Sequence, residues 1–143
     1  RQLADCVWER FSHDILLRSI KDLLSRSKDA RIYMVAGLHT GRSTLVHFFR
    51  HALAIGLCLV PVPPADVWPT CPQETTALPG SEHIMELEVG GTWDEHETPY
   101  LTGQRRPFLL HRGSPDQEDE PIQVRNHWLT VSCMAWAATE ATP

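Results

Sequence analysis

The chain has 143 residues, which is enough for one domain with its own core. Its formal net charge is −5 and its densest basic stretch is the dipeptide Arg105-Arg106, which disfavours a nucleic-acid-binding protein. The chain contains no run of about 20 apolar residues that could span a membrane, and no apolar signal segment follows Arg1. The four cysteines form no C-x-x-C pair, so we expect reduced thiols in a cytoplasmic or nuclear protein.

The first thirty residues predict a strand followed by a helix. Residues 3–7 are expected to form a short buried strand. Ser12 is the expected N-cap of the helix, and Asp14 in the first turn suits the positive end of the helix dipole. The predicted apolar face of this helix repeats at helical spacing and consists of Leu16, Ile20, Leu23 and Leu24.

A second strand and helix follow. The apolar, β-branched run at residues 32–35 predicts the strand, which stops at Ala36-Gly37, and residues 38–42 are expected to form a short loop. The helix is expected to begin at Ser43 and to end at Gly56, a residue type that often follows the last helical turn. Helical crossovers of this kind join parallel strands, and ligands of open α/β sheets bind where such strands end. The loop therefore marks the expected functional face.

The second half predicts two strands separated by loops. The proline-rich residues 61–81 and the polar residues 92–125 are predicted as long loops, and residues 116–120 as a solvated acidic tract. Strands are expected at residues 83–89 and at Trp128–Trp136. Because no helix separates these strands, we expect them to pair antiparallel as a wide hairpin at the edge of the parallel sheet. The predicted fold is a single α/β domain.

This order of elements resembles the C-terminal half of a seven-stranded S-adenosylmethionine-dependent methyltransferase, a Rossmann-like α/β fold. Ala4-Asp5-Cys6-Val7-Trp8 is similar to the Asp-x-x-aromatic motif after the fourth strand in the nicotinamide N-methyltransferase-like and protein-lysine methyltransferase group. His13-Asp14-Ile15-Leu16 resembles the start of the next helix. Val35-Ala36-Gly37-Leu38-His39-Thr40-Gly41-Arg42 resembles the fifth strand and its loop in the fungal nicotinamide N-methyltransferase-like branch.

The resemblance implies a function and a set of site residues. The implied reaction is the transfer of a methyl group from S-adenosylmethionine to a nitrogen of a protein side chain or of a small amine. Asp5 and Trp8 are the implied catalytic residues, with Trp8 walling the acceptor pocket, and Ala4 and Asp5 lie at the edge of the cofactor. The residues implied on the substrate side are His13, His39, Thr40 and Arg42.

The chain departs from this family in the half that binds the cofactor. The family holds its cofactor mainly with an N-terminal glycine-rich turn and with an acidic residue after the second strand. This chain has neither, since Gly90-Gly91, Gly37 and Gly41 lie in other elements. We therefore expect a partial or divergent member that lacks the first three strands, with a second polypeptide completing the sheet.

Two other interpretations stay open. One is a non-catalytic interaction module that keeps the half-sheet. The other is a phosphate-binding loop, because Ala36-x-x-x-x-Gly41-Arg42-Ser43 nearly matches [AG]-x-x-x-x-G-K-[ST], with Arg42 in place of the lysine. His47 and His51 lie one helical turn apart and could share a metal, but the sequence offers no third ligand, so we expect no metal site.

Overall fold

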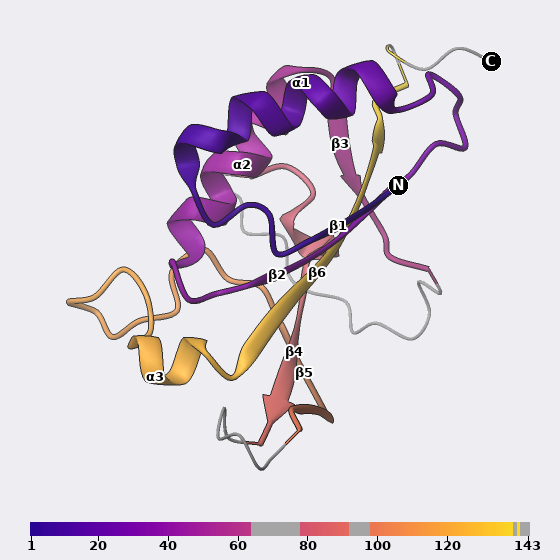
Figure 1. Ribbon diagram of the computed structural model, residues 1–143. Coiled ribbons are helices and arrows are strands. Elements are labelled where there is room, and N and C mark those ends of the chain that lie inside the picture. Colours follow the sequence, from indigo (N-terminus) through magenta and orange to yellow (C-terminus); the bar gives the residue numbers. More distant parts are fainter. Residues whose placement is uncertain (64–77, 92–97, 139, 141–143) are drawn as a thin grey trace.

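The structure, a computed structural model, describes residues 1–63, 78–91, 98–138 and 140 (Figure 1). In these residues the strands are β1 (Gln2–Ala4), β2 (Ile32–Gly37), β3 (Leu57–Val60), β4 (Met85–Gly90), β5 (Tyr100–Pro107) and β6 (Trp128–Trp136). The helices are α1 (His13–Leu23), α2 (Arg42–Ala54) and the single turn α3 (Ile122–Arg125), and 3₁₀ turns occupy Arg10–Ser12 and Ser81–His83. No helix in this part of the chain is long and apolar enough to cross a lipid bilayer.

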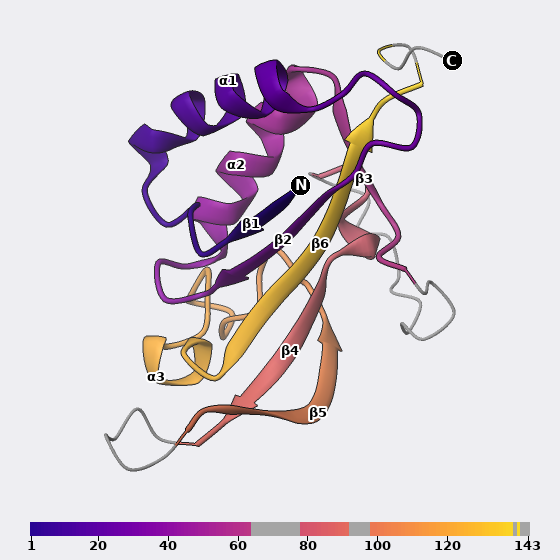
Figure 2. The same cartoon turned by 45° about the vertical axis from the view of Figure 1, so that its right-hand side comes forward.

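The fold is mixed α/β, and its strands form one sheet in which most neighbouring strands run antiparallel. β1 runs parallel to β2, with Leu3 opposite Met34, as predicted for two strands joined by a helix. The predicted bounds of 3–7 and the predicted burial are wrong, because the chain turns at Asp5 and no residue of β1 is buried. β6 pairs antiparallel with β2 along one edge, and with β3 and β4 along the other. β5 pairs antiparallel with β4 (Figure 2). The antiparallel pairing of the last two predicted strands is therefore confirmed, but β6 lies inside the sheet and not at its edge.

The predicted loop over residues 92–125 is wrong in part, because it contains β5 and α3. β5 covers no core: its first six residues are exposed and its last two are half-buried. An outer strand of this kind needs no apolar alternation, so its sequence reads as a polar loop. Most of the other predicted loop, residues 64–77, lies outside the described residues, as do residues 92–97.

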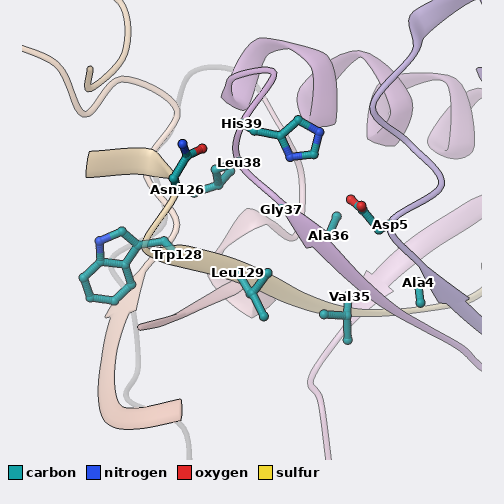
Figure 3. A pocket seen from close by; sticks show the side chains of 10 residues that line it. All are labelled: Ala4, Asp5, Val35, Ala36, Gly37, Leu38, His39, Asn126, Trp128 and Leu129. Carbon is teal, nitrogen blue, oxygen red and sulfur yellow. The ribbon is translucent and has the colours of Figure 1, made fainter. Parts of the chain in front are cut away.

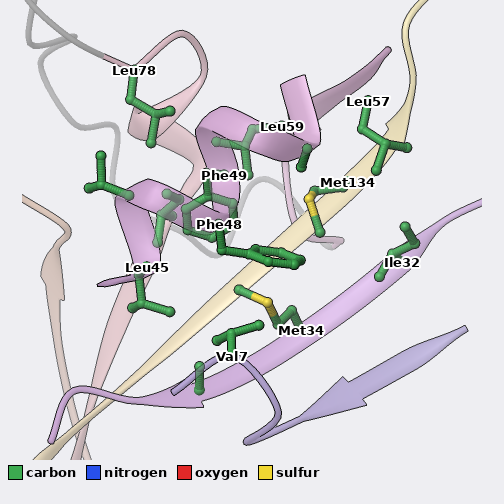
Figure 4. Packing of buried hydrophobic residues seen from close by; sticks show 14 of the residues in the cluster. Val7, Ile32, Met34, Leu45, Phe48, Phe49, Leu57, Leu59, Leu78 and Met134 are labelled. Atoms are coloured by element: carbon green, nitrogen blue, oxygen red, sulfur yellow. The ribbon is translucent and has the colours of Figure 1, made fainter. Parts of the chain in front are cut away.

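The core lies between the sheet and the two longer helices. Phe48 and Phe49 of α2 are fully buried and pack over Ile32, Met34 and Met134 of the sheet (Figure 4). Their spacing places them on one face of α2, as the sequence predicts. Gly56 ends this helix with a φ of +93°, a left-handed conformation that glycine adopts without a steric penalty.

The predictions for α1 need two corrections. Leu17 is buried, whereas Leu23 is 63% exposed at the last position of α1, and the next residue, Leu24, is buried as predicted. Ser12 precedes α1 as predicted, but its hydroxyl donates a hydrogen bond to the Glu9 carbonyl oxygen and does not cap the helix.

The two faces of the sheet are unequally covered. Both α1 and α2 lie on one face, where Ile32, Met34 and Ala36 of β2 are buried (Figures 1 and 2). The alternate residues Tyr33 and Val35 point to the other face and are 38% and 39% exposed. Parallel strands usually have both faces covered, so this part of the sheet carries apolar side chains that the described residues do not cover.

Candidate functional site

A pocket of about 430 Å³ opens where β1 and β2 end and β6 begins (Figure 3). Its walls combine small and apolar side chains with a carboxylate, an imidazole, an amide and an indole. They come from Ala4, Asp5, Val35, Ala36, Gly37, Leu38, His39, Asn126, Trp128 and Leu129. The carboxyl ends of parallel strands are the usual ligand-binding edge of an α/β sheet, and the pocket lies at that edge.

Asp5 occupies the sharp turn at which the chain leaves β1. Its backbone N–H donates a hydrogen bond to the Val35 carbonyl oxygen at 2.9 Å, which continues the pairing with β2 by one residue. Its φ is +46°, a left-handed conformation that aspartate tolerates better than most residues. This turn directs the carboxylate toward the loop after β2, and such conformations at the end of a strand cluster at functional sites.

Gly37 ends β2 and leaves the space that the polar side chains use. A Cβ atom on Gly37 would lie 2.9 Å from Nδ1 of His39 and 3.8 Å from Oδ1 of Asp5. In Figure 3 the Asp5 carboxylate and the His39 ring lie on the same side of Gly37. Any side chain at position 37 would therefore push His39 out of its place, and glycine is the residue that lets the carboxylate and the imidazole share this edge.

Trp128 and Asn126 form the opposite wall. Trp128 opens β6, and its indole lies under the guanidinium of Arg106, whose Cζ atom is 3.9 Å from the ring centroid. This cation–π contact holds one face of the indole. The amide of Asn126 lies just before the strand and adds both a donor and an acceptor to the pocket.

Arg125 fixes the loop between β2 and α2. Its NH1 atom donates hydrogen bonds to the carbonyl oxygens of Leu38 at 2.6 Å and His39 at 3.0 Å. Its Nε atom donates to the backbone carbonyl oxygen of Glu120 at 2.9 Å. The guanidinium thus ties α3 to the loop that carries His39. Rigid support of this kind positions polar groups better than a free loop does.

The pocket can therefore bind a small, partly apolar and partly polar ligand. The Asp5 carboxylate accepts hydrogen bonds and favours a cation or a pair of hydroxyl groups, and the indole of Trp128 offers an apolar surface for a flat or cationic group. His39 can donate or accept one hydrogen bond. The site lies on one sheet edge, and its outer side is open.

The structure gathers some of the predicted site residues here and places others elsewhere. Ala4, Asp5 and His39 line the pocket. Trp8 is 49% exposed and is not part of its wall, and neither is Thr40, which lies on the exposed outer side of the loop. His13 is fully buried in the core beneath α2, where it hydrogen-bonds the Val7 carbonyl oxygen and His47.

Arg42, predicted on the substrate side, lies instead in a buried ion cluster behind the loop. Its side chain is fully buried, and its Nε and NH2 atoms donate to Oε1 of Glu86, also fully buried, at 2.8 and 2.6 Å. It also bonds Asp119 and Glu120. Arg106 donates to the second Glu86 oxygen and to Glu120. The guanidinium of Arg42 is therefore bound by carboxylates, and Arg42 does not line the pocket.

This cluster corrects the prediction of a solvated acidic tract. Residues 116–118 are exposed, but Asp119 and Glu120 turn inward and are half-buried. Burial alone would raise the pKa of Glu120, but the hydrogen bonds and charges of Arg106 and Arg42 outweigh it and hold the pKa below its usual value. Asp119 and Glu120 therefore pair with the buried Arg42, which lies 77 and 78 residues away in the sequence, and Glu120 also pairs with the half-buried Arg106.

The ion cluster also removes the basis for a phosphate-binding loop. The backbone N–H of Arg42, the first residue of α2, donates to Oδ2 of Asp119 at 2.7 Å. A carboxylate therefore occupies the helix N-terminus at which a phosphate would bind. The guanidinium of Arg42 is also engaged by carboxylates. The loop around Gly41 therefore offers neither the backbone N–H of Arg42 nor its side chain to a phosphate group.

The described residues contain no group of three or more His, Cys, Asp or Glu side chains arranged to hold a metal ion. His47 and His51 do lie together, with ring centroids 4.1 Å apart. Their neighbours are Asp14, which hydrogen-bonds His51, and His13, which hydrogen-bonds His47.

The sequence predictions missed Asn126, Trp128 and Leu129 as pocket residues. These residues belong to the start of β6, and the pairing of Leu129 with Gly37 brings that start beside the end of β2. The sequence does predict a strand at Trp128–Trp136 and an antiparallel direction for it. Its position next to β2 is the missing information, because strand order depends on contacts between distant residues.

Comparison of the chain with protein-family models, with curated proteins and with solved structures found no match.

Proposed function

We propose that this chain forms the C-terminal part of an S-adenosylmethionine-dependent N-methyltransferase. The observation that carries the proposal is the position of Asp5. It follows a strand parallel to β2, and its carboxylate faces the pocket beside His39. The resemblance implies these two positions for the cofactor edge and the substrate-side loop.

The chemistry of the pocket supports a methyl donor. S-adenosylmethionine carries an ammonium group and ribose hydroxyls, which a carboxylate such as that of Asp5 accepts as hydrogen-bond donors. The space that a Cβ atom at position 37 would fill is used by the His39 ring and the Asp5 carboxylate, which places both polar groups at the edge where the ligand would bind. When bound, the cofactor would supply the methyl group, and the chain's own residues would orient donor and acceptor and exclude water.

The acceptor nitrogen is expected to enter from the side of His39. Trp128 is the aromatic wall that this structure offers, in place of Trp8, and its indole suits a planar or cationic amine. A protein side chain or a small aromatic amine meets this requirement.

Equilibrium dialysis with methyl-labelled S-adenosylmethionine tests the proposal. We expect the chain to retain label, and Asp5→Ala to reduce the binding constant by about tenfold or more, since a hydrogen bond to a charged group contributes about 1.5–3 kcal/mol. Asp22→Ala, at an exposed position of α1, is the matched control and is expected to bind as the parent does. Equal retention by the Asp5 and Asp22 variants, or none by the parent, would contradict the proposal.

We further propose that additional polypeptide covers the second face of the sheet and closes the outer side of the pocket. Tyr33 and Val35 support this, because they are apolar side chains exposed on the face of β2 that α1 and α2 leave open. β1 is the outer strand beside them in the described sheet, and an outer strand of this kind can pair with another strand.

Because this face of the sheet exposes apolar side chains, we expect the isolated chain to self-associate. We expect sedimentation velocity to show a mass that rises with concentration, and Val35→Lys to shift the protein toward the monomer by charging the open face. Ile15→Lys is the control, since Ile15 is 69% exposed on α1 and lies on the helical side. A strictly monomeric parent chain at every concentration would speak against an uncovered docking face.

A further inference from the structure

A second pocket, of about 390 Å³, lies along the side of α2 and shares no lining residue with the first. It is lined mainly by groups that can carry positive charge. They are Arg10, His47, Arg50, His51 and His111, and Ser43, Val46, Leu110 and Glu118 complete the wall. We propose that this pocket binds the phosphate group of a small phosphorylated molecule.

The charges favour an anion because the two arginines lack carboxylate partners. Within the part of the chain that the structure describes, no ion pair involves Arg10 or Arg50, and Arg10 donates one hydrogen bond to the Ser43 hydroxyl at 3.0 Å. The guanidinium groups therefore keep free donors at the pocket. Paired N–H donors of this kind match the oxygens of a phosphate group.

The histidines add a donor whose orientation is fixed. His13 is fully buried and its Nε2 atom lies 2.8 Å from the Val7 carbonyl oxygen, which only accepts, so this nitrogen carries the hydrogen. Nδ1 of a neutral His13 is then an acceptor, and the Nδ1 atom of His47, 2.8 Å away, must donate to it. The remaining ring nitrogen of His47, Nε2, is left to take up a proton and to donate to an anion.

The groups around His47 disfavour its protonated form. Burial first, and then the charges of His51, His13 and Arg10, lower the pKa of His47, and only Asp14 acts in the opposite direction. Arg50, His111 and Glu118 line the same pocket, and Glu118 is the single carboxylate among them. A bound dianion would relieve this repulsion and raise the pKa of His47, so binding and protonation should favour each other.

Inorganic pyrophosphate and inorganic phosphate are suitable probes, titrated at constant ionic strength and followed by the imidazole NMR signals of His47. We expect saturable binding of pyrophosphate, a higher pKa of His47 in the complex, and weaker binding as the pH rises above the titration of His47. Arg10→Gln and Arg50→Gln are each expected to weaken binding by about tenfold. Arg18→Gln, on the exposed face of α1, is the matched control.

Both arginines are exposed, so their replacement should leave the fold intact, which the thermal unfolding midpoint checks. The net charge of −5 opposes non-specific attraction of an anion to this chain. Binding of pyrophosphate that Arg10→Gln and Arg50→Gln leave unchanged, or an unchanged titration of His47, would overturn the proposal. Asp5→Ala separates this site from the proposed methyltransferase site, because it should leave pyrophosphate binding unaltered.

Discussion

Replacing Arg42 with methionine is expected to lower the free energy of unfolding by about 3–5 kcal/mol, the usual cost of breaking a buried ion pair. The Arg42 and Glu86 side chains are both fully buried, so the variant leaves the Glu86 carboxylate in the core with one of its main partners gone. It also removes the side-chain partner of Asp119, which is left with its bond to the backbone N–H of residue 42. A typical domain is stable by about 5–15 kcal/mol, so the loss would be a large part of the total.

Chemical denaturation followed by tryptophan fluorescence measures this effect. Arg18→Met is the matched control, because Arg18 is exposed on α1 and its replacement should change stability by less than about 0.5 kcal/mol. If both variants unfolded at the same denaturant concentration as the parent, the ion cluster would not stabilise the fold as described.

Phe48→Ala is expected to cost about 3–5 kcal/mol, since it removes a large side chain from the middle of the core and leaves a cavity. Phe48 is fully buried on α2, with its ring 5.3 Å from that of His13 and 5.8 Å from that of Phe49. The His13 ring would lose its edge contact, so the pairing of His13 with His47 should loosen as well.

Phe11→Ala provides the comparison for this core variant, because Phe11 is 79% exposed. Thermal unfolding of the two proteins should separate them clearly, with the midpoint of the Phe48 variant far below that of the Phe11 variant. Similar midpoints would mean that α2 does not pack on the sheet through Phe48.

The elements with strong local patterns could be predicted from the sequence. The apolar run that begins at Ile32 and the helical spacing of Phe48, Phe49 and Ala52 led to β2 and α2, and Gly56 marked the end of α2. The strand Trp128–Trp136 was predicted with its observed bounds. These elements bury one face or both, and burial leaves a periodic pattern in the sequence.

Features that depend on distant contacts could not be predicted. β5 is exposed over its first six residues and so carries no apolar periodicity. The partners of Arg42 lie 44 to 78 residues away, so neither its burial nor the inward turn of Glu120 is visible locally. The same holds for Trp128, which enters the pocket only because β6 lies beside β2. Of the predicted site residues, Ala4, Asp5 and His39 line the pocket. The resemblance implied Ala4 and Asp5 at the first predicted strand and His39 in the loop after the second.

Whether S-adenosylmethionine binds in the pocket at the ends of β1 and β2 is best tested by backbone amide NMR, which reports where a ligand binds as well as whether it binds. We expect saturable shifts at Asp5, Gly37, His39 and Leu129, even if this open half-site holds the ligand with a Kd on the order of 1 mM, a free energy of about −4 kcal/mol. Signals that stay in place at these four residues while the cofactor is added, or that move only elsewhere, would contradict it.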